Sequence, residues 1–163
     1  MTEKEYNQCV KDHSDHVFRF ILKNLRNPED ARDVVQTAFE KMWTVRATVE
    51  TAKCKSFLFT VAYHQMIDHL RKGKLVMINE DSAGKVTIAG SQGGRLHKML
   101  EKALDRLNEV QRSLVLLKDY EGYSYEEIAE ITGLNASQVK VYLHRARIQL
   151  RNYIVRPENI LER

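Results

Sequence analysis

Apolar residues recur at helical spacing along most of the chain, and residues that favour helix starts divide this pattern into segments. In the first segment, Thr2 with Glu5 three residues later can cap a helix that continues to about residue 25. The apolar side of this helix consists of Val10, Val17, Phe18, Ile21, Leu22 and Leu25. Asn27 and Pro28 predict a second helix over about residues 28–48, because Asn caps free amides and Pro suits the first helical position.

The second predicted helix has an apolar stripe wider than one neighbouring helix needs. The stripe consists of Val34, Val35, Ala38, Phe39, Met42 and Trp43. One interpretation is that part of it faces a protein partner. The alternative is that Phe39 and Trp43, one helical turn apart, are ordinary core residues.

A third helix is expected over about residues 54–72, because apolar residues keep a helical repeat there. The positions expected in the core are Phe59, Ala62, Met66 and Leu70. Aromatic residues alternate with basic residues along this segment. The aromatic residues are Phe57, Phe59 and Tyr63, and the basic residues are Lys53, Lys55, Arg71 and Lys72. Aromatic faces beside positive charge can hold unstacked bases. Some of these residues are needed for core packing instead. The candidates for a nucleic-acid contact at the surface are therefore Tyr63, His64 and the flanking basic residues.

Two helix starts and one turn stand at helix-turn-helix spacing near the C-terminal end. Ser124 with Glu127 forms a capping box, and Gly133 can take the left-handed conformation that ends a helix. Asn135 with Gln138 then caps a second helix. The buried stripe of that helix is expected to be Val139, Leu143, Ala146 and Leu150. This pattern predicts a DNA-binding motif.

The opposite face of the last helix is polar and basic. It carries Ser137, Lys140, Val141, His144, Arg145 and Arg147. Residues 131–157 contain five Lys or Arg residues and no Asp or Glu. Such a face suits phosphates and base edges in the major groove. The alternative is a pair of amphipathic helices whose charges are merely solvated.

The glycines predict two domains. Residues 1–72 contain none, whereas five of the seven glycines lie between residues 73 and 94. A flexible linker over residues 73–95 is therefore expected, in which residues 75–78 could pair as a brief strand. It would separate an all-α domain over residues 1–72 from a second over 96–157, followed by a tail at 158–163.

Charge and length set further bounds. The 163 residues carry a net charge of +4, and the basic excess lies in residues 53–74 and in the C-terminal helices. Two separate basic surfaces make polyanions plausible partners. No apolar run approaches the roughly 20 residues that span a bilayer. With a polar N-terminus, this predicts a cytoplasmic protein that inserts no segment into a membrane.

Neither a metal site nor a cofactor is expected from the sequence. Cys9 and Cys54 lack the spacing of zinc ligands or of a disulfide framework. His64 and His69 have no further ligand at helical spacing. A nuclease or recombinase would need a positioned nucleophile or clustered carboxylates, but the acids are scattered and Ser124 and Ser137 have uses at helix starts. The protein is therefore not expected to be an enzyme.

Three segments together resemble the extracytoplasmic-function (ECF) sigma factors of bacteria. They are NPEDARDVVQTAFEKMW, KSFLFTVAYHQMIDHLR and LNEVQRSLVLLKDYEGYSYEEIAEITGLNASQVKVYLHRAR. The resemblance covers almost the whole chain. It implies a sigma-2 domain of three to four helices over residues 1–72 and a sigma-4 helix-turn-helix domain over residues 96–157, joined by the linker. It also implies a promoter-specificity subunit of RNA polymerase, held in check by an anti-sigma factor.

The resemblance assigns roles to residues by their position in its motifs. The polymerase-binding residues, on the clamp helices of the largest subunit, are Asp33, Gln36, Phe39 and Trp43. The residues at the melted −10 element are Lys55, Phe57, Tyr63, His64, Arg71 and Lys72. The residues that read the −35 element are Ser137, Gln138, Lys140, Val141, His144, Arg145 and Arg147. The sigma-4 domain is also expected to contact the flap region of the polymerase.

The chain departs from the family pattern at three positions. Phe57 stands where the family usually has Trp, His64 where it has Asn, and Thr37 where it has an acid. His64 therefore leaves the base preference at the −10 element open. The other function considered is a stand-alone helix-turn-helix regulator that binds a palindrome as a dimer, which gel filtration would distinguish from a monomeric sigma factor.

Overall fold

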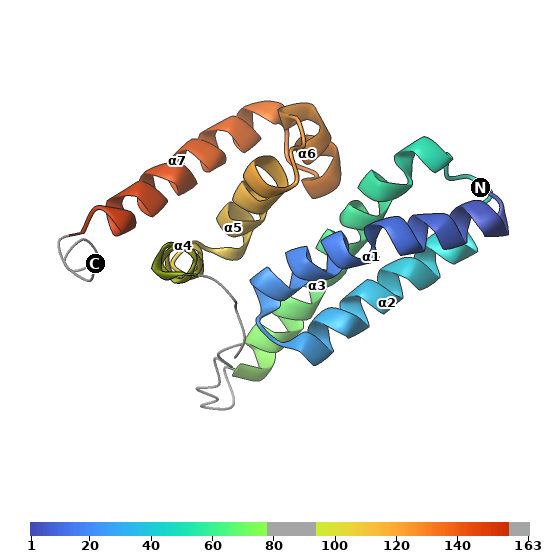
Figure 1. The fold of residues 1–163 in the computed structure, drawn as a ribbon, viewed down its shortest axis with the longest axis horizontal. Coiled ribbons are helices and arrows are strands. Elements are labelled where there is room, and N and C mark those ends of the chain that lie inside the picture. Colours follow the sequence, from blue (N-terminus) through green and yellow to red (C-terminus); the bar gives the residue numbers. More distant parts are fainter. Residues whose placement is uncertain (78–93, 157–163) are drawn as a thin grey trace. The chain divides into compact units, whose positions relative to one another are not determined.

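The computed structural model describes residues 1–77 and 94–156, and Figure 1 shows their helices. Within these ranges the chain is all-α, as predicted, and contains no strand. It divides into two compact units, Met1–Thr87 and Ile88–Arg163. Residues 78–93 of the predicted linker and the predicted tail at 158–163 lie outside the described residues.

The first unit is a bundle of three mutually packed helices, α1 (Glu3–Leu25), α2 (Pro28–Thr44) and α3 (Cys54–Met77). A short 3-10 turn, η1 (Thr51–Lys53), precedes α3. The predicted caps are confirmed: the Thr2 hydroxyl accepts from the Glu5 amide, and the Asn27 side chain accepts from the amides of Glu29 and Asp30. Its largest fully buried side chains are Val17, Ile21, Met42, Leu58, Phe59 and Met66.

The second helix ends earlier than predicted, at Thr44 instead of about residue 48. Side chains after that point bond to the backbone of the preceding turn. The Thr44 hydroxyl donates to the Lys41 carbonyl at 2.7 Å, the Arg46 guanidinium to the Trp43 carbonyl at 2.7 Å, and the Thr48 hydroxyl to the Val45 carbonyl at 2.8 Å. These local bonds compete with the helical ladder and favour turns.

The third helix continues beyond its predicted end, through Gly73 to Met77. A glycine inside a helix costs only about 1 kcal/mol relative to alanine, which the neighbouring helix formers can offset. The prediction of a strand at residues 75–78 is therefore wrong for 75–77, and Ile78 lies outside the described residues.

The second unit contains α4 (Arg95–Asp105), α5 (Glu109–Val115), the π-helical turn η2 (Leu116–Tyr120), α6 (Tyr125–Thr132) and α7 (Ala136–Ile154). Its buried core includes Leu104, Leu107, Leu114, Leu117, Ile128 and Leu143. Arg112 holds the turn between α4 and α5, because its guanidinium donates to the carbonyls of Leu104 at 2.9 Å and Leu107 at 2.8 Å.

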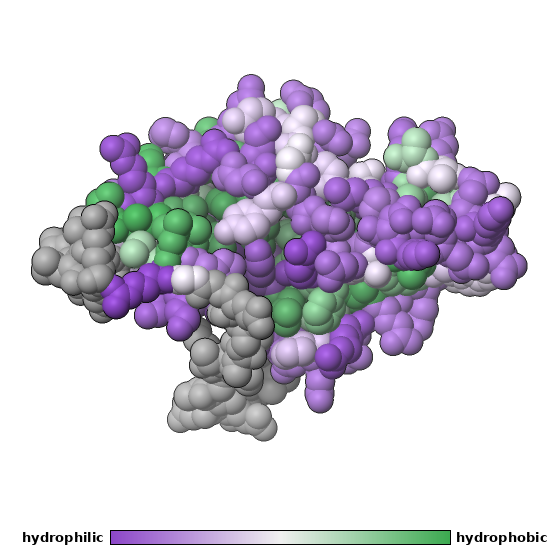
Figure 2. Space-filling model, viewed as in Figure 1, coloured by the Kyte–Doolittle hydropathy of each residue, from purple (hydrophilic) through white to green (hydrophobic). Residues whose placement is uncertain are grey.

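Polar residues cover most of the face shown in Figure 2, as expected when apolar side chains are used in the two cores. No helix in residues 1–77 and 94–156 combines the length and apolar character that a membrane crossing requires.

Candidate nucleic-acid interface

The turn between α6 and α7 has the geometry that the sequence predicted. The Ser124 hydroxyl accepts from the Glu127 amide at 3.1 Å, and the Glu127 carboxylate accepts in return from the Ser124 amide at 3.0 Å. Asn135 and Gln138 form the same reciprocal pair, at 2.8 and 3.0 Å. Gly133 between them has φ 80°, in the left-handed region. Both helix starts and the turn are thus fixed by local contacts.

The buried and exposed faces of α7 also follow the prediction. Val139, Leu143 and Ala146 are buried, whereas Leu150 is only half-buried. All seven predicted DNA-binding residues are exposed: Ser137, Gln138, Lys140, Val141, His144, Arg145 and Arg147. Successive residues of a helix are rotated by about 100° about its axis, so these seven side chains do not all point in one direction. Some lie on a line that faces outward, and the others lie on the two flanks of that line.

The outward line of α7 lies opposite its buried face. It consists of Ser137, Val141, His144 and Ile148. Val141 and Ile148 are 46% and 45% exposed, a large fraction for such apolar residues. The sequence interpretation missed Ile148, although its position seven residues after Val141, about two helical turns, was a signal for it. The centre of this face is thus partly apolar, with basic side chains on either side of it.

One flank of α7 carries Lys140 and Arg147, and the structure distinguishes them. Arg147 forms an ion pair with Asp119 of η2 at 2.6 Å, so its charge is already compensated. The Lys140 ammonium instead lies 5.3 Å from the ring centroid of Tyr125, the first residue of α6. Lys118 lies over the same ring at 4.7 Å and adds a base that the sequence interpretation did not include.

The other flank carries Gln138 and Arg145. The Gln138 side-chain oxygen is used in the capping box with Asn135, which orients this residue at the first turn of α7. Arg145 is exposed. With Lys140 across the helix, it places positive charge on both sides of the outward line.

In the first unit, α3 brings three of the six predicted −10 residues onto one line. Phe57, His64 and Arg71 follow one another at intervals of about two helical turns. Phe57 is half-buried, whereas His64 and Arg71 are exposed. An aromatic ring, an imidazole and a guanidinium therefore share one side of this helix. Lys72 is exposed as well but lies to one side of the line.

Tyr63 and Lys55 are not placed as the sequence indicated. Tyr63 was a surface candidate, but its side chain is buried at 5% exposure, and burial raises the pKa of its phenol. Its ring meets the His64 ring edge-on at 5.4 Å, so it supports His64 from beneath. Lys55 is half-buried. Its ammonium lies 5.9 Å from the Phe59 ring, and its charge acts on His13.

The predicted polymerase-binding residues on α2 lie at the edge of the bundle. Asp33 and Gln36 are exposed, and Phe39 and Trp43 are half-buried, so the two aromatic residues are not ordinary core. The Trp43 ring meets the Tyr6 ring at 4.8 Å, and the Arg46 guanidinium lies 3.7 Å from its centroid.

Tyr6 and Arg46 were both missed from the sequence. The Tyr6 hydroxyl also donates to the Phe39 carbonyl at 2.9 Å, which links α1 to this edge of α2. Trp43 is thus fixed in orientation with part of its ring accessible.

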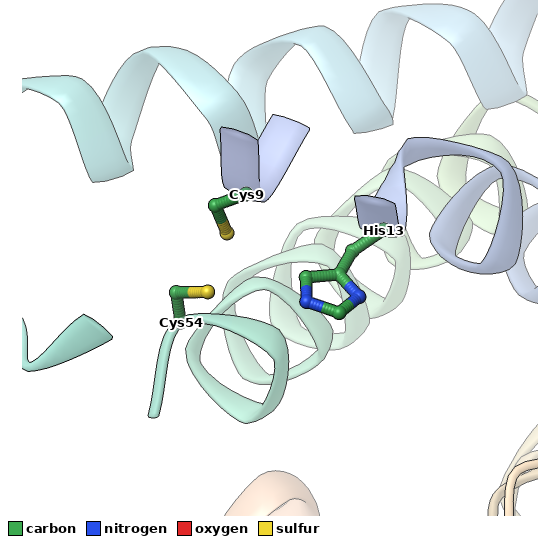
Figure 3. A group of neighbouring side chains, drawn as sticks. All are labelled: Cys9, His13 and Cys54. Carbon is green, nitrogen blue, oxygen red and sulfur yellow. The ribbon is translucent and has the colours of Figure 1, made fainter. Parts of the chain in front are cut away.

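Three potential metal ligands meet elsewhere in the first unit, although the sequence gave no ligand spacing. The ligand atoms of Cys9, His13 and Cys54 all lie within 4.8 Å of one another (Figure 3). The three residues form no short sequence motif, because Cys54 is distant in sequence from Cys9 and His13. Only the packing of α1 against α3 brings it close to the other two. His69, in contrast, pairs with Asp30 at 3.2 Å.

A chain that combines a helix-turn-helix with an exposed, partly basic recognition helix and a separate three-helix bundle has the make-up of a DNA-binding transcription protein. Residues 9–75 match the family model described as Sigma-70 region 2, and residues 97–150 match Sigma-70, region 4. The chain belongs to the sigma-70 family and is an ECF RNA polymerase sigma factor. Proteins of this class are non-catalytic initiation factors that bind core RNA polymerase and direct it to promoters.

Among its relatives, RNA polymerase sigma factor SigV of Bacillus subtilis is 33% identical over 147 residues, covering 87% of this chain and 89% of SigV. ECF RNA polymerase sigma factor SigE of Mycolicibacterium smegmatis is 29% identical, covering 93% of this chain and 62% of SigE. The fold is similar to that of the sigma factor RpoE solved with the anti-sigma factor NepR from Bartonella quintana. That similarity has a TM-score of 0.80 and 24% identity, and covers 93% of this chain and 97% of RpoE.

Proposed function

We propose that this sigma factor recognises two promoter elements with two separate helices, α7 at the −35 element and α3 at the melted −10 element. In this proposal the sigma-2 domain is the bundle of α1, α2 and α3, extended from the predicted boundary at 72 to Met77, the sigma-4 domain begins with α4 at Arg95, and the linker joins the two. Membership of the sigma-70 family favours this function over that of a stand-alone dimeric regulator.

The observation that carries the proposal is the exposed face of α7. Lys140 and Arg145 flank the outward line and are suited to phosphates or guanine edges. Val141 and Ile148, exposed at the centre of the line, are suited to apolar contact with thymine methyl groups. Arg147, paired with Asp119, is proposed to position η2 against α7 and to make a smaller contribution to DNA binding.

The line of Phe57, His64 and Arg71 on α3 supports a second contact, to single-stranded DNA. A base taken out of the stack can lie against the Phe57 ring or the His64 imidazole, while Arg71 attracts the backbone. Stacking on an aromatic ring is worth about 1–3 kcal/mol per base, and extrusion costs a few kcal/mol. Holding one extruded base therefore offsets much of the cost of opening the duplex.

The edge of α2 at Phe39 and Trp43, with Asp33 and Gln36 beside it, is the proposed contact with the clamp helices of the polymerase. A partly accessible Trp held between Tyr6 and Arg46 has the rigidity that interface anchors typically show. The second unit is proposed to contact the flap region. Each DNA reader alone is weak, and the polymerase raises the effective concentration of one when the other is bound.

An anti-sigma factor is the further partner that we propose. RpoE and CnrH, two solved sigma factors of similar fold, were each solved with such a partner, NepR and the cytosolic domain of CnrY. A partner of this kind would inhibit the chain by covering polymerase-binding residues such as Trp43. Exposed apolar residues, including Leu96 at 66%, offer further area for it.

Run-off transcription with purified core polymerase and the full-length chain tests the two-element proposal. Lys140→Glu should abolish transcription from a −35-dependent promoter and leave co-purification with core polymerase unchanged. The matched control is Lys98→Glu, the same charge reversal at an exposed position of α4, which should transcribe normally. Equal transcription by the Lys140→Glu and unmodified proteins would refute the assignment of α7.

A further inference from the structure

Cys9, His13 and Cys54 form a compact cluster between α1 and the start of α3 (Figure 3). Two sulfur atoms and an imidazole nitrogen lie within 4.8 Å of one another. Both cysteines are buried and unoxidised, at 3% and 4% exposure, whereas His13 is half-buried. None of the three residues belongs to the sets assigned to DNA or to the polymerase, although Cys54 lies in the same turn of α3 as Phe57.

The backbone holds the three groups in place independently of any ligand. Cys9 and His13 are one helical turn apart on α1, a spacing that directs two ligands to the same side of a helix. Cys54 is the first residue of α3. The Thr51 hydroxyl in η1 donates to the Glu5 carboxylate, and the N-terminal ammonium donates to the Arg46 carbonyl at 2.8 Å. These contacts fasten the first turn of α1 to the segment that leads to Cys54.

We propose that Cys9, His13 and Cys54 bind one zinc ion, with water completing a tetrahedral site. Zinc takes thiolate sulfur at about 2.3 Å and imidazole nitrogen at about 2.0–2.1 Å. Tetrahedral bonds of that length separate two sulfur ligands by about 3.8 Å. For a sulfur and a nitrogen ligand the corresponding separation is about 3.6 Å, so the present separations of up to 4.8 Å need to close by about 1.2 Å at most, through side-chain rotations. A set of two cysteines and one histidine with an open fourth position is an established zinc arrangement.

Protonation and charge are consistent with this site. Burial and the neighbouring Cys54 raise the pKa of the Cys9 thiol, so zinc must displace its proton. Burial, and then the charge of Lys55, lower the pKa of His13, which keeps a nitrogen lone pair available. As two Zn–S bonds form, two protons leave the thiols for solvent. The resulting unit of one Zn²⁺ and two thiolates is neutral, so it suits this largely buried position, where Asp12, His16 and Lys55 already act on His13.

Zinc at this position would link α1 to the first turn of α3, the turn that carries Phe57. Because a metal that binds only the folded chain stabilises it by mass action, the first unit should unfold at a higher temperature with zinc present. The site does not depend on the proposed roles of α7 and α3.

The test uses the full-length chain, reduced and freed of metal, titrated with Zn²⁺ alone and with Co²⁺ as a spectroscopic substitute. We expect one ion per chain and, with Co²⁺, thiolate-to-metal charge transfer together with the d–d absorption of tetrahedral cobalt. Zn²⁺ should raise the unfolding temperature of the first unit, followed by fluorescence of Trp43, the one tryptophan in the chain.

Cys9→Ser and His13→Asn should each weaken zinc binding by about 100-fold or more, since even the loss of an outer partner costs about 10–100-fold. His97→Asn is the matched control, because His97 is an exposed histidine of α4 in the second unit. If Cys9→Ser fails to fold, zinc binding by His13→Asn still tests the proposal, because His13 is only half-buried. The proposal is overturned if cobalt gives no thiolate absorption, or if His13→Asn binds zinc like the unmodified chain.

Discussion

Part of the Trp43 side chain packs within the first unit, and the rest is exposed. Substitutions at this position can distinguish its role in the fold from its role in binding. Its ring contacts Tyr6 and Arg46 within the first unit, and the remainder of the side chain is open to a partner. Truncation of a central interface Trp typically costs 2 kcal/mol or more of binding free energy. In the proposed clamp contact, the accessible part of the indole is the part expected to contribute to polymerase binding.

We expect Trp43→Ala to weaken binding to core polymerase by about 30-fold or more, as roughly 2 kcal/mol implies. Trp43→Phe, which keeps an aromatic ring, should retain part of the affinity. Titration of labelled chain with core polymerase measures both, and far-UV circular dichroism checks that the helices persist. Undiminished affinity of Trp43→Ala would exclude Trp43 from the polymerase contact.

Glu5 gives the first unit a dependence on pH. Hydrogen bonds from Thr51 and then Thr2 hold the pKa of this carboxyl below its usual 4.5. The folded-state pKa is thus lower than the unfolded one, so the contribution to stability is present above 4.5 and lost as the pH falls through the lowered pKa. Urea unfolding followed by Trp43 fluorescence should show a weaker acid dependence for Glu5→Gln than for the unmodified chain. An identical dependence would show that this pair does not couple folding to protonation.

Residues whose role depends on local contacts could be predicted from the sequence. Ser124, Asn135 and Gly133 act within one turn, so their neighbours in sequence determine what they do. Tyr63 and Lys55 could not be placed in this way, because helical spacing does not say which neighbouring helix covers a side chain.

At the scale of elements, α6 and α7 depend on a turn that only a residue with positive φ can make. Gly133 has φ 80°. Gly73, in contrast, lies inside α3 with no atom within 4 Å of the position that a Cβ would take. The two glycines therefore make opposite contributions: Gly133 permits a helix end, whereas Gly73 weakens a helix that continues.

Gly133→Ala should destabilise the second unit by about 1–2 kcal/mol, the cost of a left-handed alanine. Gly73→Ala should stabilise α3 by about 0.5–1 kcal/mol, because alanine restricts the unfolded chain and suits a helix. Trp43 fluorescence reports unfolding of the first unit, and hydrogen exchange of α6 and α7 reports that of the second. Changes of the same sign at both positions would contradict this account of the two glycines.

Helix ends were the weakest part of the sequence prediction for a physical reason. Apolar periodicity identified α1, α2 and α3, but the stop of α2 at Thr44 depends on side-chain bonds to its own backbone. The continuation of α3 to Met77 depends on neighbouring helix formers outweighing one glycine. In both cases the free energies of continuing and of ending the helix differ little, and the spacing of apolar residues carries no information about that difference.

At the scale of the whole molecule, function is proposed to come from two readers that act together. The fold class and the family followed from the order of the motifs along the chain. The cluster of Cys9, His13 and Cys54 did not, since it needs two segments far apart in sequence to meet across α1 and α3.

The most direct test of the central claim is run-off transcription by core polymerase with this chain on a promoter selected from a genomic library. The account predicts a specific transcript that disappears when either the −35 or the −10 element is scrambled. It should also disappear when about 5 base pairs, half a helical turn, are inserted between the elements, because the readers then face different sides of the duplex. Transcription that needs only one element, or the absence of any promoter-specific transcript, would contradict the account.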